Sequence, residues 1–131
     1  MNYRINPRSI SPPVGNHSHA ILTKGTNSFL HTSGIAPIAT DGTVPAEIGD
    51  QARVIWENAK AILADAHMEP QDIISTTTYV VVGEDLNSPT EERDKFFNGH
   101  QAAAATISIP ALTDKAWKIE ISIVAAKDAS N

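Results

Sequence analysis

The chain of 131 residues contains no cysteine, which excludes disulfide bonds, thiolate nucleophiles and zinc sites built on thiolates. Aromatic residues make up only 5% of the sequence, so few side chains could stack on the bases of single-stranded nucleic acid. No stretch is rich in lysine and arginine, and the formal net charge is −5, which disfavours binding to a phosphate backbone. The apolar runs are far shorter than the roughly 20 residues of a transmembrane helix. These absences disfavour nucleic-acid and membrane partners.

The remaining composition is that of an ordinary globular protein, with 41% hydrophobic and 19% charged residues. The length predicts a single domain with a sizeable core. The first residues lack the apolar segment of a signal peptide. We therefore expect one cytoplasmic domain over residues 1–126, followed by a flexible tail at residues 127–131.

Two helices are predicted from the pattern of apolar residues. The first runs from Ile48 to about His67, because apolar side chains recur at three- and four-residue spacing, which is typical of a helix with one buried face. These side chains are Ile48, Ala52, Ile55, Trp56, Ala59, Ile62, Leu63 and Ala66. The second helix begins at Asn87, a predicted capping residue, has Pro89 in its first turn and ends near Phe97.

The predicted strands cover residues 1–5, 19–24, 28–33, 73–82, 106–109 and 117–124. A turn at Gly25 to Asn27 predicts that the second and third strands form a hairpin. In the last strand, one face is predicted to pack beneath the helices; it carries Trp117, Ile119, Ile121 and Ile123. Two helices cover only one face of such a sheet, so the other, partly apolar face favours oligomerisation.

Four local strings, in their order along the chain, resemble the RidA/YjgF family, also called the L-PSP endoribonuclease family. They lie at residues 15–20, 32–37, 51–63 and 118–121, within a similarity that spans about residues 10 to 126. The resemblance implies an α+β, chorismate-mutase-like fold with one mixed sheet and two helices on one face. It also implies a homotrimer with a central barrel and clefts between subunits. Typical members hydrolyse enamines and imines, such as 2-aminoacrylate, to a 2-keto acid and ammonia, and we expect no cofactor.

In typical members a glutamate, a serine and a tyrosine line the cleft. The glutamate falls on Glu120 and the serine on Ser33, followed by Gly34. Without the resemblance, a glutamate within a strand would be taken as a solvent-facing residue, and Ser33 as a hydroxyl bonded to local backbone. With it, we expect Glu120 to act as a general acid–base and Ser33, beside Gly34, to bind a ligand carboxylate or carbonyl.

The tyrosine position of the family holds His17, and a neighbouring glutamine is replaced by His19. Because they stand two residues apart, the two histidines would point the same way in a strand. They could ligate a metal with His31 and Glu120, but one cleft-facing histidine and one hydrogen-bonded histidine are expected instead, with no metal. A more specific hypothesis is that His17 pairs with Glu120 and, as a cation, holds a substrate carboxylate.

The family's arginine, which holds the substrate carboxylate, falls on Ala104 or Ala105, and no arginine follows Arg93. Loss of a forked guanidinium–carboxylate contact weakens binding roughly tenfold to a hundredfold. Lys118 is the only other nearby cation on the face of Glu120, and we expect it in an exposed ion pair. The four alanines at 102–105 could also be a helix-to-strand connection that packs against a neighbouring subunit.

Two functions therefore stay open. The first is an enamine or imine deaminase with altered substrate preference, because Ala104 and Ala105 open the cleft to bulkier substrates related to 2-aminomuconate. The second is a non-catalytic trimer that binds a small metabolite or regulates another process. A ribonuclease or translation inhibitor is disfavoured by the acidic charge and the scarcity of aromatic residues.

Overall fold

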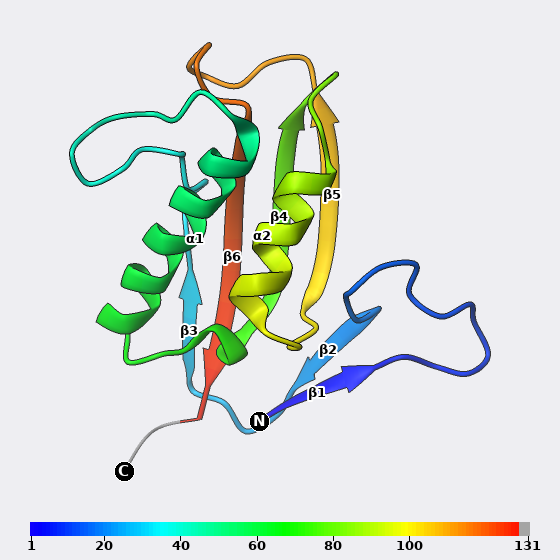
Figure 1. Cartoon of the computed structure of the whole chain (residues 1–131). Coiled ribbons are helices and arrows are strands. Elements are labelled where there is room, and N and C mark those ends of the chain that lie inside the picture. The colour runs from blue at the N-terminus through cyan, green and yellow to red at the C-terminus, as the bar shows by residue number, and fades with distance from the viewer. Residues whose placement is uncertain (129–131) are drawn as a thin grey trace.

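The computed structural model describes residues 1–128 and has two helices side by side on one face of a β-sheet (Figure 1). Helix α1 spans Ile48–Asp65 and helix α2 spans Asn87–Phe97. The strands are β1 (Asn2–Ile5), β2 (Ala20–Thr23), β3 (Ser28–His31), β4 (Ile73–Val81), β5 (Ala103–Ile109) and β6 (Ile119–Lys127). A short 3₁₀ turn, Pro70–Asp72, leads into β4.

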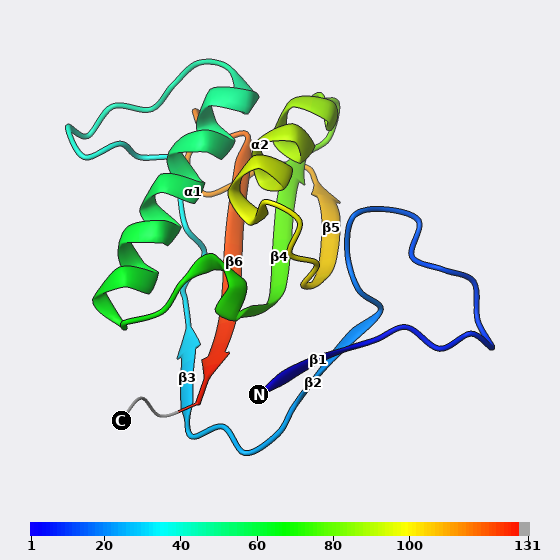
Figure 2. The same ribbon diagram turned by 60° about the horizontal axis from the view of Figure 1, so that its bottom comes forward.

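The main sheet has four strands in the order β3-β6-β4-β5. Strands β4 and β5 are parallel and the other neighbours are antiparallel, so the sheet is mixed. Strands β1 and β2 form a separate antiparallel pair that lies near the start of β5 (Figure 2). An isolated parallel bridge between Ser18 and Ala103 joins this pair to the β5 edge. The predicted α+β architecture, with two helices on one face of a mixed sheet, is confirmed.

The core lies between the helices and the sheet. Ala52, Ile55 and Leu63 are buried along α1, as the helical spacing predicts, whereas Ile62 is 37% exposed at the edge of the predicted stripe. Trp56 is 3% exposed, and its ring stacks on Phe96 with 4.6 Å between centroids. The buried face of β6 carries the alternating residues Ile119, Ile121, Ile123 and Ala125. Trp117 precedes this strand and is half-buried, so the predicted strand start was two residues early.

Gln51 is a buried polar residue that connects α1 to the start of β6. Its amide nitrogen donates to the carbonyls of Pro45 and Ala116, both at 2.8 Å. Its amide oxygen accepts a hydrogen bond from the backbone nitrogen of Lys118, also at 2.8 Å. Since every polar atom of the side chain is paired, Gln51 is compatible with the core and fixes the backbone two residues before Glu120.

The predicted hairpin of the second and third strands is wrong. β2 pairs with β1, and β3 instead pairs with β6, with His31 opposite Val124. Gly25 does adopt a positive φ of 65°, so the chain reverses there as predicted. A local turn signal cannot specify which distant strand supplies the hydrogen bonds, and here the strands on either side of the turn join different sheets.

Two boundaries also differ from the prediction. β5 begins at Ala103 rather than at Thr106, because three of the alanines pair with Ser75, Thr76 and Thr77 of β4 in place of a loop. The prediction of a helix-to-strand connection therefore holds only for the first alanine. β6 continues through Lys127, one residue into the segment predicted as a tail, and residues 129–131 lie outside the described part of the chain.

The N-cap residue of α2 is Leu86 rather than the predicted Asn87, and Asp85, one residue earlier, bonds the first backbone nitrogens of the helix. The Asp85 carboxylate accepts hydrogen bonds from the backbone nitrogens of Asn87 and Ser88 at 3.0 and 3.1 Å and from the Ser88 hydroxyl at 2.6 Å. These bonds hold the pKa of the Asp85 carboxyl below its ordinary value, chiefly through the Ser88 hydroxyl. Neither helix, both of which lie in the described part, is long and apolar enough to cross a membrane.

Candidate functional site

Glu120 lies on the face of the sheet that the helices leave uncovered. Its neighbours in β6, Ile119 and Ile121, point to the helices and are buried, so alternation places Glu120 on the opposite side. The side chain is half-buried, and its cross-strand partner in β4 is Tyr79. Opposed residues of antiparallel strands have Cβ atoms about 5 Å apart, so the phenol ring of Tyr79 borders the glutamate.

The carboxylate of Glu120 rests directly on the backbone of Gly34. A Cβ atom added to Gly34 would lie 2.3 Å from Oε2 and 2.5 Å from Cδ of Glu120. Real Cβ atoms do not approach so closely, so any other residue at position 34 would force the carboxylate to move. Glycine at this position lets the backbone approach the carboxylate closely, and Ser33 is the residue that precedes it.

Ser33 and Gly34 follow β3 at a local irregularity of the sheet. His31 pairs with Val124, whereas Ile35 forms an isolated bridge with Ile121, so one extra residue is accommodated on this edge. Such an irregularity bends the strand and changes the direction of nearby side chains. Ser33 and Gly34 are both exposed, so this edge can be reached by a ligand.

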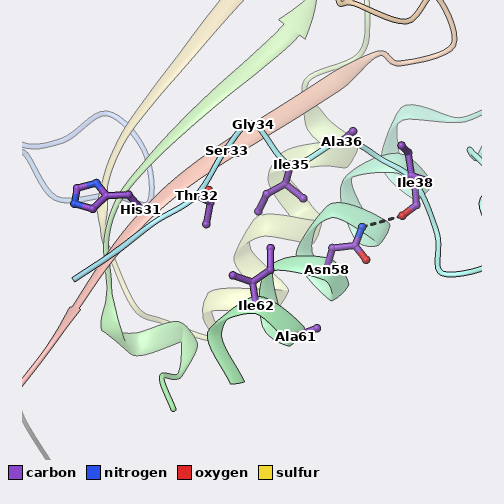
Figure 3. Close-up of a pocket in the computed structure, with 10 residues that line it drawn as sticks. All are labelled: His31, Thr32, Ser33, Gly34, Ile35, Ala36, Ile38, Asn58, Ala61 and Ile62. Carbon is purple, nitrogen blue, oxygen red and sulfur yellow. Dashed lines mark hydrogen bonds between the residues drawn. The ribbon is translucent and has the colours of Figure 1, made fainter. Parts of the chain in front are cut away.

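A groove of ≈ 630 Å³ runs along the other side of this segment, between the chain after β3 and helix α1 (Figure 3). Ser33 and Gly34 form part of its wall, and Asn58 donates a hydrogen bond of 2.9 Å to the carbonyl of Ile38 across it. Glu120 is not among its described lining residues, so the groove and the glutamate meet only at Gly34.

The two alanines that could occupy the arginine position lie on different faces of β5. Ala105 pairs with Thr77, two residues before Tyr79 in β4, and so shares the uncovered face with Glu120. Ala104 lies on the opposite face, together with Thr106, which contacts the cavity beneath α2. Only Ala105 is therefore on the side of the sheet where Glu120 lies.

His17 and His19 are held at the β5 edge of the molecule. Between them, buried Ser18 donates from its hydroxyl to the carbonyl of Gln101 at 2.6 Å and from its backbone nitrogen to the carbonyl of Ala102 at 3.0 Å. Nε2 of His19 lies 2.6 Å from the carbonyl oxygen of Ser11, which agrees with the expectation of one histidine bonded to backbone. The ring of His17 is half-buried and makes no hydrogen bond within residues 1–128.

Within one chain, the predicted site residues therefore lie in two separate groups. Glu120, Ser33 and Gly34 lie at the β6–β3 side of the sheet, and His17 lies beside β5 at the opposite edge. Strand β4 stands between them, and within the described residues Glu120 forms no ion pair with a histidine. Within residues 1–128, no group of three or more histidine, aspartate or glutamate side chains is arranged to hold a metal ion.

The local charge near Glu120 is small. Lys118, predicted in an exposed ion pair, lies 3.6 Å from Oε1 of Glu84, and both side chains are partly exposed. Such a pair contributes little to stability. Because Lys118 already has a carboxylate partner, it is poorly suited to hold a substrate carboxylate as well.

Tyr79 is the site neighbour that the sequence did not indicate. It lies in a long β-branched strand without a local motif, and its position opposite Glu120 depends on the register between β4 and β6. The two residues are far apart in sequence, so only the pairing of the strands brings them together. A sequence of one protein carries no signal for that register beyond the alternation of apolar residues.

Both the sequence and the fold of the chain resemble those of known proteins. Residues 9–127 match the family model described as endoribonuclease L-PSP. The putative reactive intermediate deaminase TdcF of Escherichia coli is 36% identical over 105 residues, which cover 78% of this chain and 81% of TdcF. The 2-iminobutanoate/2-iminopropanoate deaminase of Escherichia coli is 34% identical over 104 residues, covering 76% of this chain and 80% of that protein.

Solved structures show the same fold. The Rid-family protein YyfB of Yersinia pestis superposes with a TM-score of 0.85 at 26% identity, covering 96% of this chain and 98% of that one. The structure of Escherichia coli TdcF with bound serine gives a TM-score of 0.70 at 28% identity, covering 96% of this chain and 99% of TdcF. The chain therefore belongs to the RidA/YjgF family, in which two relatives are named as a putative reactive intermediate deaminase and a 2-iminobutanoate/2-iminopropanoate deaminase.

Proposed function

We propose that this protein hydrolyses the C=N bond of small imines, including those formed when enamines tautomerise, in clefts that form between the subunits of a homotrimer. The contact of the Glu120 carboxylate with Gly34 is the observation that carries the proposal. It supports the proposal because the carboxylate touches the residue that follows Ser33, at an accessible edge of the sheet. The names of the two deaminase relatives support the reaction class.

The separation of the site residues supports a cleft shared by two subunits. Glu120, Ser33 and Gly34 would come from one subunit, and His17, His19 and Ala105 from the β5 edge of the next. The uncovered sheet face supplies apolar surface for such an assembly, since Phe29 is 53% and Ile107 41% exposed. Burial of that face against other subunits would bring the opposite edges of two sheets together.

In this cleft, Glu120 takes a proton from water as the water oxygen attacks the C=N carbon. The proton passes to the nitrogen and gives a carbinolamine. Glu120 then transfers the hydroxyl proton of the carbinolamine to the nitrogen as the C–N bond breaks, which releases ammonia and leaves a carbonyl group. Ser33 donates a hydrogen bond to the substrate carboxylate or carbonyl. His17, in the position of the family's tyrosine, orients water and, when protonated, attracts an anionic substrate.

Ala105 sets the substrate preference in this proposal. It lies on the face of Glu120 where we place the family's arginine, and a methyl group leaves more space and no positive charge there. The alanine therefore favours a substrate that is bulkier than 2-aminoacrylate or that depends less on a charged group to hold its carboxylate. The same alanine favours the second function, a non-catalytic trimer that binds a small metabolite in the retained cleft.

The rate of keto-acid release distinguishes these functions. Imino acids are generated in solution by an amino-acid oxidase, and the protein is expected to accelerate their hydrolysis above the spontaneous rate. Glu120→Gln should lower the added rate by about a hundredfold or more, because removal of a general acid–base costs that much. Ser122→Ala is the matched control, since Ser122 lies two residues along the same face of β6. No acceleration by the wild type, with ligand binding retained, would favour the non-catalytic trimer.

A further inference from the structure

A second cavity lies on the helix-covered side of the sheet, away from Glu120. It has a volume of ≈ 140 Å³ and lies between helix α2 and strands β4, β5 and β6. Its walls combine apolar and polar side chains: Thr78, Val80, Leu86, Pro89, Thr90, Arg93, Thr106, Ile119 and Ile121. A cavity needs about 10–15 Å³ of such space to hold one water, so this one has room for several water-sized groups.

Arg93 is the one charged side chain among the described residues that line this cavity. Its side chain is 19% exposed, so its charge is largely removed from solvent. Nε and Nη2 both donate to the same oxygen, Oδ1 of Asp94, at 3.3 and 3.2 Å. Asp94 also accepts a hydrogen bond from Asn16 at 3.2 Å, so this oxygen serves three donors.

This arrangement leaves part of the guanidinium unpaired. A guanidinium has five N–H donors in a planar fork, and within residues 1–128 Nη1 of Arg93 makes no hydrogen bond. A forked pair with a carboxylate uses two parallel donors and is stronger than two bonds to one oxygen. Arg93 therefore keeps donor capacity for an acceptor in the cavity.

Two threonine hydroxyls border the same space. Thr78 of β4 and Thr106 of β5 are direct neighbours in the parallel pair, so both side chains lie on the helix face. Neither hydroxyl is hydrogen-bonded to another group in the described part of the chain, whereas that of Thr90 is bonded to the carbonyl of Leu86 at 2.8 Å. Two free hydroxyls thus accompany the guanidinium.

We propose that this cavity is a binding site for a short aliphatic monocarboxylate. Arg93 and the hydroxyls of Thr78 and Thr106 would bind the carboxylate, and the apolar walls formed by Val80, Leu86, Pro89, Ile119 and Ile121 would contact a short alkyl chain. The volume limits the ligand to a few non-hydrogen atoms. The site is separate from the proposed cleft, because Arg93 and Glu120 lie on opposite faces of the sheet, and it does not depend on imine hydrolysis.

Titration with propanoate, followed by amide chemical shifts of the full chain, tests the proposal. We expect saturable shifts at Thr78, Thr90 and Thr106, with weaker or no binding of inorganic phosphate and none of the neutral isostere propanamide. Arg93→Gln should weaken propanoate binding roughly tenfold to a hundredfold, and Arg93→Lys should weaken it less. Arg53→Gln is the matched control, since Arg53 is an exposed helix arginine paired with Asp50 at 2.7 Å outside the cavity.

Several results would overturn the proposal. These are unchanged affinity in folded Arg93→Gln, equal binding of propanamide, equal or tighter binding of phosphate, or shifts centred on Gly34 and Glu120. If Arg93→Gln does not fold, Thr106→Val supplies the test, because Thr106 is an exposed residue of an edge strand. Loss of one hydrogen bond to the charged carboxylate should weaken binding roughly tenfold to a hundredfold. An unchanged affinity in that variant would contradict the assignment.

Discussion

At the scale of single residues, the site depends on the absence of a side chain at position 34. The Glu120 carboxylate occupies the space that a Cβ atom of residue 34 would take, with 2.3 Å between them. The pair Ser33 and Gly34 and the distant Glu120 were all indicated by sequence as site residues. The contact between Gly34 and Glu120 was not, because it arises only when the chain after β3 packs along β6.

Gly34→Ala should therefore displace the carboxylate without removing it. We expect imine hydrolysis to fall roughly tenfold to a hundredfold, because displacement of a catalytic group by about 1 Å has an effect of this size. Steady-state rates and thermal unfolding of the variant are the measurements. In a Glu120→Ala background the same change should cause no further loss, since the clash is gone. A wild-type rate in Gly34→Ala would show that the position of this carboxylate is unimportant.

At the scale of elements, the helices were the best predicted parts of the molecule. The apolar spacing placed α1 to within two residues at its C-terminal end, at Asp65 rather than His67. The sequence predicted where the strands lie but not which strands pair with each other. β2 and β3, for example, join different sheets. Helical hydrogen bonds are local, whereas strand pairing joins distant residues, and alanines such as Ala103 become a strand because β4 supplies a partner.

The start of α2 provides a prediction that depends on pH. The Asp85 carboxylate caps this helix, and its pKa in the folded protein is depressed below the ordinary value of 3.8. A depressed carboxyl pKa contributes stability above the unfolded pKa, and this contribution is lost as the pH falls through the folded pKa. Asp85→Ala should therefore lower the unfolding temperature near neutral pH, and the difference from wild type should narrow below about pH 4.

Asp65→Ala is the matched control for Asp85→Ala, because it removes a carboxylate at the C-terminal end of the other helix, α1. Asp65 is the last residue of α1, and in the described chain its carboxylate accepts no hydrogen bond. A negative charge at a helix C-terminus is unfavourable, so Asp65→Ala should not lower the unfolding temperature at neutral pH. A loss in Asp85→Ala that stays constant across the acidic range would contradict the capping role of Asp85.

At the scale of the whole molecule, one chain carries two incomplete parts of the proposed site. Glu120 and Ser33 lie at the β6–β3 side, and His17 lies at the β5 edge beside the bridge of Ser18 with Ala103. Sequence indicated these residues but not their separation, because the distance between strands depends on the sheet order. We infer that a neighbouring subunit joins the two parts into one cleft.

Complementation between two variants tests whether one cleft contains residues of two subunits. Glu120→Ala and His17→Phe are each expected to lose most of the imine hydrolysis activity. When the two variants are unfolded and refolded together, random assembly places an intact Glu120 opposite an intact His17 in about one quarter of the clefts. We expect the activity to recover to roughly that fraction of the wild-type rate, and not to recover when the separately assembled variants are merely mixed. No recovery after joint refolding, although mixed trimers form, would contradict a site shared between subunits.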